Sequence, residues 1–227
     1  YASLCKGGKM MKGLLLKDLY IAKSNILVII GSLIVLGFGL SVLIEASALL
    51  VLAPPCATTA VFISITSDAN SKWSKNVITM PVSRSQIIGE KFILFIILSV
   101  LGIMAALIPC GVLAIFGAEI TLASLLLYGS IGVSAALFAG CFSLPCAYFF
   151  DPDKSQIVFL MSFLASTGII VALVLLINLF IPVKGNILLP FNIVLIIAAI
   201  FFFISHKIAV MAYQEKDIID KSQYRSK

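Results

Sequence analysis

The sequence predicts an all-α integral membrane protein with six transmembrane helices. Its 227 residues are 61% hydrophobic and only 11% charged, and the mean hydropathy is +1.17. A soluble domain is about half apolar and about a quarter charged. The apolar surface of this chain therefore exceeds what a globule of its size can bury. The charged residues also lie in short segments that separate six long uncharged runs.

Each uncharged run has the length of one membrane-spanning helix. The runs cover residues 24–44, 46–67, 92–118, 120–150, 155–183 and 185–206. A helix needs about 20 apolar residues to cross a hydrocarbon core of about 30 Å. The shortest run has 21 residues and the longest has 31. Each run therefore holds one helix, and none holds two helices with a turn between them.

The basic residues predict the orientation of the spans, because cytoplasmic loops of membrane proteins accumulate Lys and Arg. Five basic residues precede the first span, four lie within 67–91, one is Lys154 and five follow residue 206. With both termini in the cytoplasm, only Lys184 falls on the outer side. The net charge of +6 is thus mainly a topology signal with some attraction to anionic lipid, and it predicts no nucleic-acid partner.

The chain divides into a six-span domain at 24–206 and flanking segments. We expect 1–9 to be a tail outside the fold, either a leader remnant or residues added for expression. Residues 10–23 predict an amphipathic helix on the inner leaflet, with Leu15, Leu19 and Ala22 on one side. Residues 207–227 form a predicted cytoplasmic tail.

The sequence lacks the motifs of an enzyme or of a self-powered transporter. It has no G-x-x-x-x-G-K-[ST] nucleotide loop and no H-E-x-x-H or G-x-S-x-G motif. Its one histidine, His206, ends the last span, and the five cysteines lack the spacing of a metal site. No predicted span carries a charged residue in its middle, where ion-coupled carriers need one. We therefore predict no catalytic residues, no metal and no cofactor in this chain.

Small residues recur at helical spacing in the fourth span. Gly132, Ala136 and Gly140 are four residues apart, a pattern that lets helices approach closely. Such a ridge serves either packing within one bundle or contact with a second subunit, and the sequence leaves both open.

Four prolines lie away from the ends of predicted spans, at Pro54, Pro55, Pro109 and Pro145. Each removes one hydrogen bond of the helical ladder and leaves a carbonyl to be satisfied elsewhere. These positions are either simple kinks or the wall of a transport pathway.

The segment 67–91 carries the most specific pattern. Ser67 or Asp68 is a predicted helix cap, and Trp73, Val77 and Met80 form one apolar stripe. A proline ends this short helix, and an S-x-x-Q capping box opens the next one. The residues assigned to this amphipathic segment and its exit are Asp68, Ser71, Lys72, Trp73, Lys75, Val77, Met80, Pro81 and Arg84.

The segment MKGLLLKDLY, the loop SKWSKNVITMPVSRSQIIGEK and six spans with both ends inside resemble small bacterial ABC transporter permeases of the type-2 exporter class. The resemblance covers Met11 to His206, and Ser74 stands where an acidic residue is expected. It implies that the helix in 67–91 is a coupling helix that docks on a separate ATPase subunit, which binds ATP and Mg. It also implies a working unit of two permeases, identical or paralogous, and two ATPases.

The function expected from these observations is ATP-driven export across a bacterial cell membrane. With an apolar interior and short outer loops, the expected cargo is hydrophobic or amphipathic: a peptide toxin or antimicrobial peptide, a drug or a lipid. The alternative is a membrane sensor or immunity scaffold that binds peptide without transporting it. The sequence does not decide between these two functions.

Overall fold

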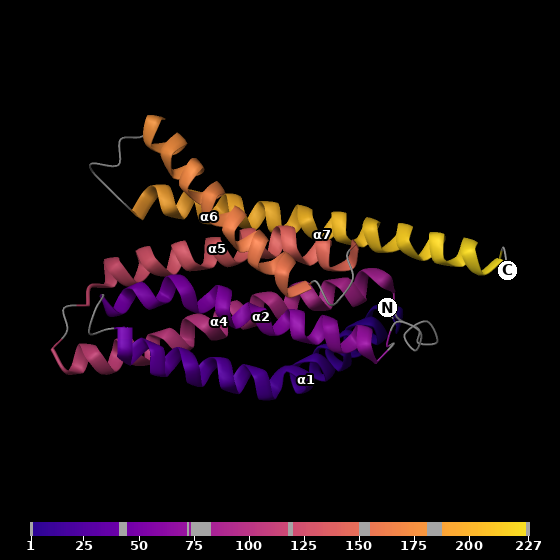
Figure 1. The fold of residues 1–227 in the computed structure, drawn as a ribbon, viewed down its shortest axis with the longest axis horizontal. Coiled ribbons are helices and arrows are strands. Elements are labelled where there is room, and N and C mark those ends of the chain that lie inside the picture. Colours follow the sequence, from indigo (N-terminus) through magenta and orange to yellow (C-terminus); the bar gives the residue numbers. More distant parts are fainter. Residues whose placement is uncertain are drawn as a thin grey trace.

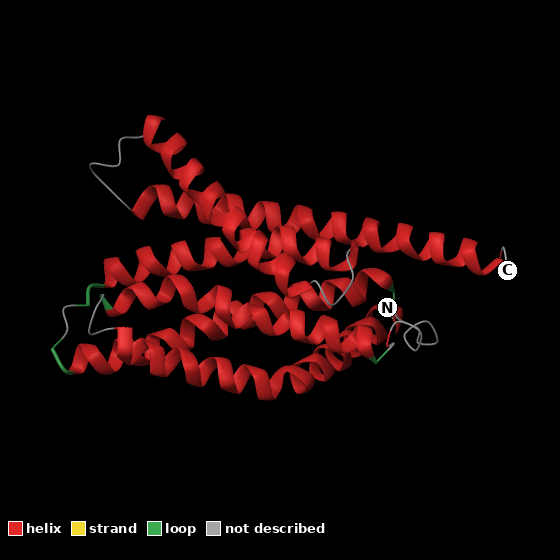
Figure 2. Ribbon diagram, in the orientation of Figure 1, coloured by secondary structure: helices red, strands yellow, loops and turns green. Residues whose placement is uncertain are grey.

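Six long helices pack side by side in the computed structural model, which describes residues 2–40, 45–71, 73, 83–117, 120–149, 155–180 and 188–225 (Figure 1). The helices are α1 (Ala2–Leu40), α2 (Leu49–Asn70), α4 (Arg84–Ile115), α5 (Leu122–Phe149), α6 (Ser155–Phe180) and α7 (Leu188–Arg225), with a 3-10 turn, η1 (Ala46–Ala48), ahead of α2. The described part of the chain contains no strand (Figure 2).

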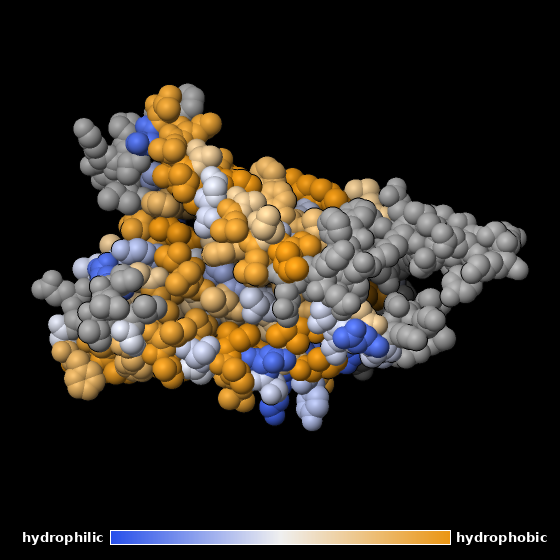
Figure 3. All heavy atoms as spheres, viewed as in Figure 1, coloured by the Kyte–Doolittle hydropathy of each residue, from blue (hydrophilic) through white to orange (hydrophobic). Residues whose placement is uncertain are grey.

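All six helices are long and apolar enough to cross a membrane. The candidate spans are Gly13–Gly39, Ala46–Asn70, Ser85–Ile115, Leu122–Ala147, Ile157–Leu179 and Leu188–Met211. Figure 3 shows a largely hydrophobic surface along the helices, as expected for side chains that contact lipid. The all-α fold with six long apolar helices is therefore confirmed.

The helices differ in how much of each is covered by the others. Two-thirds of the apolar window of α2 is buried, against 50% for α4 and 50% for α5, whereas α1 is only 11% buried. Buried aromatic rings fill the space between α4 and α7, where Phe202 packs against Phe92 and Phe95. The centre of the bundle is thus α2 with α4 and α5, and much of the surface of α1 faces outward.

Both predicted terminal segments are parts of long helices. α1 is continuous from Ala2 to Leu40, so no break separates an interfacial helix at 10–23 from a span at 24–44, and residues 2–9 belong to the same helix. Likewise, α7 continues to Arg225 through most of the predicted tail 207–227. The sequence has no Pro or Gly beside residue 23 or residue 207 that would stop a helix. This explains why α1 and α7 continue through the predicted boundaries there.

The small-residue ridge of α5 packs inside this chain. A Cβ added to Gly132 would lie 2.1 Å from the carbonyl oxygen of Leu50, and one added to Gly140 would lie 2.7 Å from the Phe95 ring. Ala136 is completely buried. The sequence leaves open whether this ridge packs within one bundle or against a second subunit. The contacts described here are packing within one chain.

The prolines of α2 explain the close approach at Gly132. Pro54 has no N–H to donate to the carbonyl of Leu50, four residues earlier, so that carbonyl lacks its usual helical partner. Gly132 of α5 packs against this same carbonyl. Pro55 is buried beside Pro54.

Pro109 and Pro145 are also buried, within α4 and α5. A Cβ added to Gly37 of α1 would lie 2.7 Å from the Pro109 ring, so this proline fills the contact between α1 and α4. The contacts described for Pro54 and Pro109 are helix packing, and the alternative of a pathway wall stays a prediction.

Candidate functional site

Charged side chains from three helices meet inside one end of the bundle, where α1 begins its apolar part, α2 ends and α4 begins. We call this end the charged end. Lys17 and Asp18 come from α1, Asp68 from α2, and Glu90 and Lys91 from α4. Figure 3 shows hydrophilic surface near this end, over α1.

The positions of these residues follow from the spacing of each helix. In α1 the buried face runs through Leu14, Asp18 and Ala22, which are four residues apart and 7%, 0% and 0% exposed. Asp18 therefore points into the bundle, where an apolar residue would ordinarily stand. Leu19, which the sequence placed on the apolar side with Leu15 and Ala22, is 37% exposed.

Lys91 is the centre of the site, and its side chain is only 5% exposed. Its Nζ donates to Oδ2 of Asp18, to Oδ2 of Asp68 at 2.7 Å and to Oγ of Ser64 at 2.8 Å. An ammonium group has three N–H donors. All three are satisfied here, by two helices other than its own.

Asp68 links this buried lysine to a second, more exposed one. Its Oδ1 accepts from Nζ of Lys17 at 2.6 Å, while its Oδ2 accepts from Lys91. Lys17 Nζ also lies 3.1 Å from Oδ1 of Asp18 and 4.2 Å from the centre of the Trp73 ring. Trp73 is the one residue between 72 and 82 that the structure describes, and this cation–π contact places its ring at the charged end.

Among the five described residues of this cluster, three are carboxylates and two are lysines. Glu90 is 2% exposed, and its Oε1 has no hydrogen-bond partner among the described residues. Oδ1 of Asp18 is likewise without a hydrogen bond, although Lys17 is within ion-pair distance. Buried charges that are only partly satisfied are costly, and a change in one of them affects its neighbours.

This arrangement can transmit force between helices. Charge-assisted hydrogen bonds are stronger than neutral ones and have defined directions. Through Lys91, Asp18 and Asp68, the ends of α1, α2 and α4 are held together, and through Lys17 the same group reaches Trp73. Trp73 is therefore linked through Lys17 to the contacts that join three helices.

The described residues of the charged end do not form an arrangement suited to a metal. In the part of the chain that the structure describes, no group of three His, Cys, Asp or Glu side chains could hold a metal ion. The position between Asp18 and Asp68 is taken by the Lys91 ammonium.

The structure brings only some of the predicted coupling residues to this site. Asp68 and Trp73 are there, whereas Ser71 is the residue that ends α2, with its hydroxyl donating to the Asp68 carbonyl at 3.2 Å. Lys72, Lys75, Val77, Met80 and Pro81 lie outside the described residues. Arg84 is the first residue of α4.

The sequence predicts one helix cap at Ser67 or Asp68 and another at Ser83, and the structure bears out only the second. Neither Ser67 nor Asp68 opens a new helix, because α2 continues to Asn70 and the Asp68 carboxylate is engaged by two lysines. The capping box at the start of α4 is confirmed. Ser83 Oγ accepts from the Gln86 N–H at 3.3 Å, and Gln86 Oε1 accepts from the Ser83 N–H at 3.0 Å.

Sequence reasoning missed the charge network itself. From the sequence, Lys17 and Lys91 are basic residues of the inner side and parts of the two family-like segments, and Asp18 and Glu90 have no separate role. The available signal was the pair of doublets Lys17–Asp18 and Glu90–Lys91, each placed where an apolar face begins. A carboxylate at the spacing of buried residues predicts a cationic partner on another helix.

Comparison with known proteins assigns the chain to a family. The family model for an ABC-2 family transporter protein matches residues 13–214, which include all six spans and the whole charged end. Neither the curated proteins nor the solved structures give a significant match. The match over most of the chain shows that this protein belongs to the ABC-2 family and is a membrane subunit of that type of transporter.

Proposed function

We propose that this chain is the permease subunit of an ATP-driven exporter in a bacterial cell membrane, and that the segment after α2 is its coupling helix. A separate ATPase subunit binds ATP and Mg and drives the permease through that helix. Family membership supports the transporter role, and ABC-2 membrane subunits in general work with such an ATPase.

The contact between Trp73 and Lys17 is the observation that carries the coupling assignment. The ring lies 4.2 Å from the ammonium, and the same ammonium is bonded to Asp68 at 2.6 Å. If the segment after α2 only connected two spans, its aromatic side chain would not need to contact a buried ionic network. Large aromatic residues are also common anchors at protein–protein contacts.

The charged end is the cytoplasmic end in this proposal. Most basic residues of the chain lie in segments that start or finish there, as the positive-inside rule requires. When the ATPases close on ATP, they tilt the coupling helix, and the charge network passes the movement to α1, α2 and α4. The permease pair then alternates between inward-open and outward-open states.

The working unit is a pair of permeases, either two copies of this chain or this chain with a paralogue, together with two ATPases. The cargo is a hydrophobic or amphipathic molecule: a peptide toxin, an antimicrobial peptide, a drug or a lipid. The support is the apolar character of the six spans.

The test is the effect of Trp73→Ala on the complex purified with its ATPase from the native cell. We expect ATPase activity to continue while uptake of a fluorescent amphipathic peptide into inside-out vesicles is lost. Tyr20→Ala is the matched control, since Tyr20 is an aromatic residue of α1 that is 78% exposed.

Two results would overturn parts of the proposal. Unchanged transport and unchanged ATP dependence in Trp73→Ala would remove the coupling assignment. A complex that binds the peptide but never concentrates it in vesicles would support the scaffold function and exclude export of that peptide.

A further inference from the structure

Two buried carboxyl groups are in contact at the charged end. The side chains of Asp18 in α1 and Glu90 in α4 are within hydrogen-bonding distance of each other. The two residues are 0% and 2% exposed. Oδ1 of Asp18 and Oε1 of Glu90 accept no hydrogen bond from any described residue. Two carboxyl groups from different helices thus meet in the interior with an unused acceptor on each.

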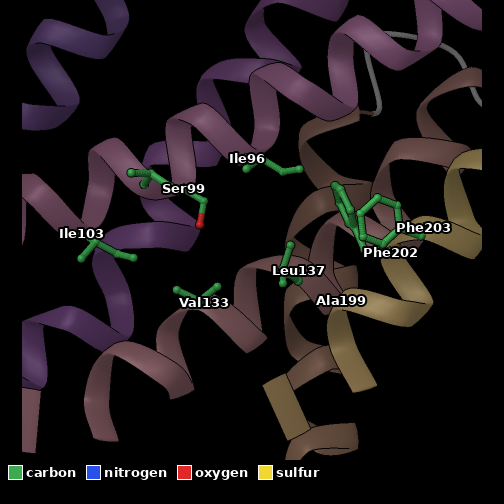
Figure 4. Close-up of a pocket in the computed structure, with 9 residues that line it drawn as sticks. Ile96, Ser99, Ile103, Val133, Leu137, Ala199, Phe202 and Phe203 are labelled. Atoms are coloured by element: carbon green, nitrogen blue, oxygen red, sulfur yellow. The ribbon is translucent and has the colours of Figure 1, made fainter. Parts of the chain in front are cut away.

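This contact differs from the other buried polar groups that lack a partner. Among the described residues, those groups are the hydroxyls of Ser47 and Ser99. Ser99 lies beside a hollow between α4, α5 and α7, and Figure 4 shows that the other labelled side chains there are apolar. A hydroxyl without a partner is far less costly than an unpaired charge in the same surroundings. The contact between Asp18 and Glu90 is therefore the one that needs a further explanation.

The two lysines of the charged end supply no hydrogen-bond donor to Glu90. Lys91 Nζ already uses its three N–H groups, on the carboxylates of Asp18 and Asp68 and on a serine hydroxyl. Lys17 Nζ donates to Asp68 at 2.6 Å and lies 3.1 Å from Asp18. An ionised Glu90 would therefore be a buried charge without a hydrogen-bonded partner, and such a charge is costly.

The charges of the cluster balance when one of its carboxyl groups is neutral. Two ammonium groups, from Lys17 and Lys91, face three carboxyl groups. Asp68 accepts from both lysines, and Asp18 accepts from Lys91. These two are the ionised carboxylates, so the neutral group is Glu90.

One further titratable side chain lies near this part of α4. The Nε2 atom of His206 in α7 is 3.4 Å from the position of a Cβ on Gly89, and its ring packs edge-on against Phe92. No hydrogen bond or ion pair from His206 to Glu90 is described. The surroundings of Glu90 are therefore set by the charged residues of α1 and α2 and by its neighbour Lys91.

We propose that Asp18 and Glu90 form a proton-binding site, in which Glu90 carries the proton and donates it to the Asp18 carboxylate. Oδ1 of Asp18 is the available acceptor, because Lys91 is bonded to Oδ2. Two carboxyl groups in contact do not both ionise, because their like charges repel at short distance. A proton also needs no space beyond that of the O–H bond, so it fits between buried groups that leave no room for a larger ligand.

Proton binding makes the contact between α1 and α4 depend on pH. Loss of the Glu90 proton to water leaves three carboxylates against two ammonium groups in the interior. At neutral pH a solvated glutamate is ionised, so the folded chain binds one more proton at this position than the unfolded chain does. The contribution of Glu90 to stability therefore falls as the pH rises from neutral to mildly alkaline.

The test is infrared spectroscopy of the full-length chain in a maltoside detergent, which has no carbonyl group of its own. A protonated carboxyl group has a C=O stretching band that is separate from the bands of a carboxylate and moves in D₂O. We expect such a band at neutral pH, where solvated Asp and Glu are ionised. Glu90→Gln should remove it. Glu45→Gln, which alters an exposed carboxylate, is the control and should leave it.

Asp18→Asn separates a shared proton from one that is held by burial of Glu90 alone. Without the Asp18 charge, an ionised Glu90 can take its place beside Lys91, and two carboxylates then balance two lysines. We therefore expect this variant to lose the band as well.

A second measurement is the unfolding temperature as a function of pH. The amide of Glu90→Gln is uncharged and keeps an N–H donor for Asp18, so this variant should match the unaltered chain at neutral pH. As the pH rises, the unaltered chain should lose stability and Glu90→Gln should become the more stable of the two.

Three results would overturn the proposal. The first is a spectrum at neutral pH without the band, or with a band that remains in Glu90→Gln. The second is a band that persists in Asp18→Asn, because Glu90 would then hold its proton without Asp18. The third is an equal loss of stability with pH in Glu90→Gln and the unaltered chain. None of these measurements needs an ATPase or a cargo, so each is independent of the export function.

Discussion

Lys91 of α4 is buried against Asp18 of α1, a residue 73 positions earlier in the chain. Neither side chain meets solvent to any extent, at 5% and 0% exposed. Breaking such a pair leaves one charge in an apolar interior without its partner, and this is costlier than removing both charges. The contact fixes the start of the α1 span against the start of α4.

We expect Asp18→Leu to lower the free energy of unfolding by about 3–5 kcal/mol, because Lys91 then loses a buried counter-charge. The double variant Asp18→Leu with Lys91→Met should recover most of that loss. Thermal unfolding in detergent can be followed with a thiol-reactive fluorophore in a background with Cys5, Cys56 and Cys146 replaced by Ala, since Cys110 and Cys141 are buried in the folded chain. A single variant as stable as the unaltered protein would contradict the described geometry.

The control for this experiment is Glu45→Gln, which also removes one carboxylate charge. Glu45 is exposed, and its carboxylate accepts from the Tyr128 hydroxyl at 3.0 Å. Exposed charges contribute little to stability, so we expect a change of less than about 0.5 kcal/mol.

Gly132 provides a sharp packing test. A Cβ at this position meets the Leu50 carbonyl oxygen at 2.1 Å, a backbone atom that a side-chain rotation cannot move. We expect Gly132→Ala to lower the unfolding temperature and to cost about 1–3 kcal/mol, as overpacking does. Gly129→Ala, on the same helix with open space around its Cβ, should be neutral or stabilising by up to about 1 kcal/mol. Equal effects of the two variants would contradict the close approach of α5 to α2.

The sequence alone predicts the features of this fold that depend on residues close together in the chain. The six spans follow from the lengths of apolar runs, and the start of α4 follows from Ser83 and Gln86, which are three positions apart. These are local signals, and helix formation and capping are local events. The structure has one continuous α1 through residue 23, where the sequence has no Pro or Gly to stop a helix.

The charge network could not be read in the same way. Lys91 meets Ser64, Asp68 and Asp18 across sequence separations of 27, 23 and 73 residues, and one sequence alone does not give the relative rotation of three helices. The ridge at Gly132 was recognised as a packing device, but its partner carbonyl in α2 depended on the same unknown arrangement. The pairing of polar groups far apart in the chain is therefore the part of this fold that one sequence alone does not predict.

The capping box at the start of α4 predicts where the helix frays first. Ser83→Ala removes the hydroxyl that accepts from the Gln86 N–H, and should cost about 1 kcal/mol. Hydrogen–deuterium exchange should then speed up at Gln86 and Ile87, whose amides gain access to solvent, and not in the middle of α4. Ser85→Ala is the control, because Ser85 is exposed and outside the box. Faster exchange in Ser85→Ala alone would contradict the assigned cap.

The proposed orientation predicts which ends of the spans react from outside the cell. In a background with the native cysteines replaced, Glu45→Cys and Leu122→Cys should react with a membrane-impermeant maleimide on intact cells. Both positions are exposed and lie at the end opposite to the charged end. Ser85→Cys should react only after the cells are opened. The reverse pattern would place the charged end, and any ATPase contact with it, outside.

A double-mutant cycle can isolate the contact between Trp73 and Lys17. Cation–π contacts are worth about 0.5–2 kcal/mol, depending on how far they are removed from water. Lys17→Met removes the charge and keeps most of the aliphatic chain, whereas Trp73→Leu removes the aromatic face. If the two groups interact, the double variant loses less stability than the sum of the single ones. Lys23→Met with Trp73→Leu is the matched control, since Lys23 is an exposed lysine of α1 with no contact described to Trp73. Additive effects in both cycles would mean that Trp73 is not energetically linked to the charged end, and its role in coupling would then lose its structural basis.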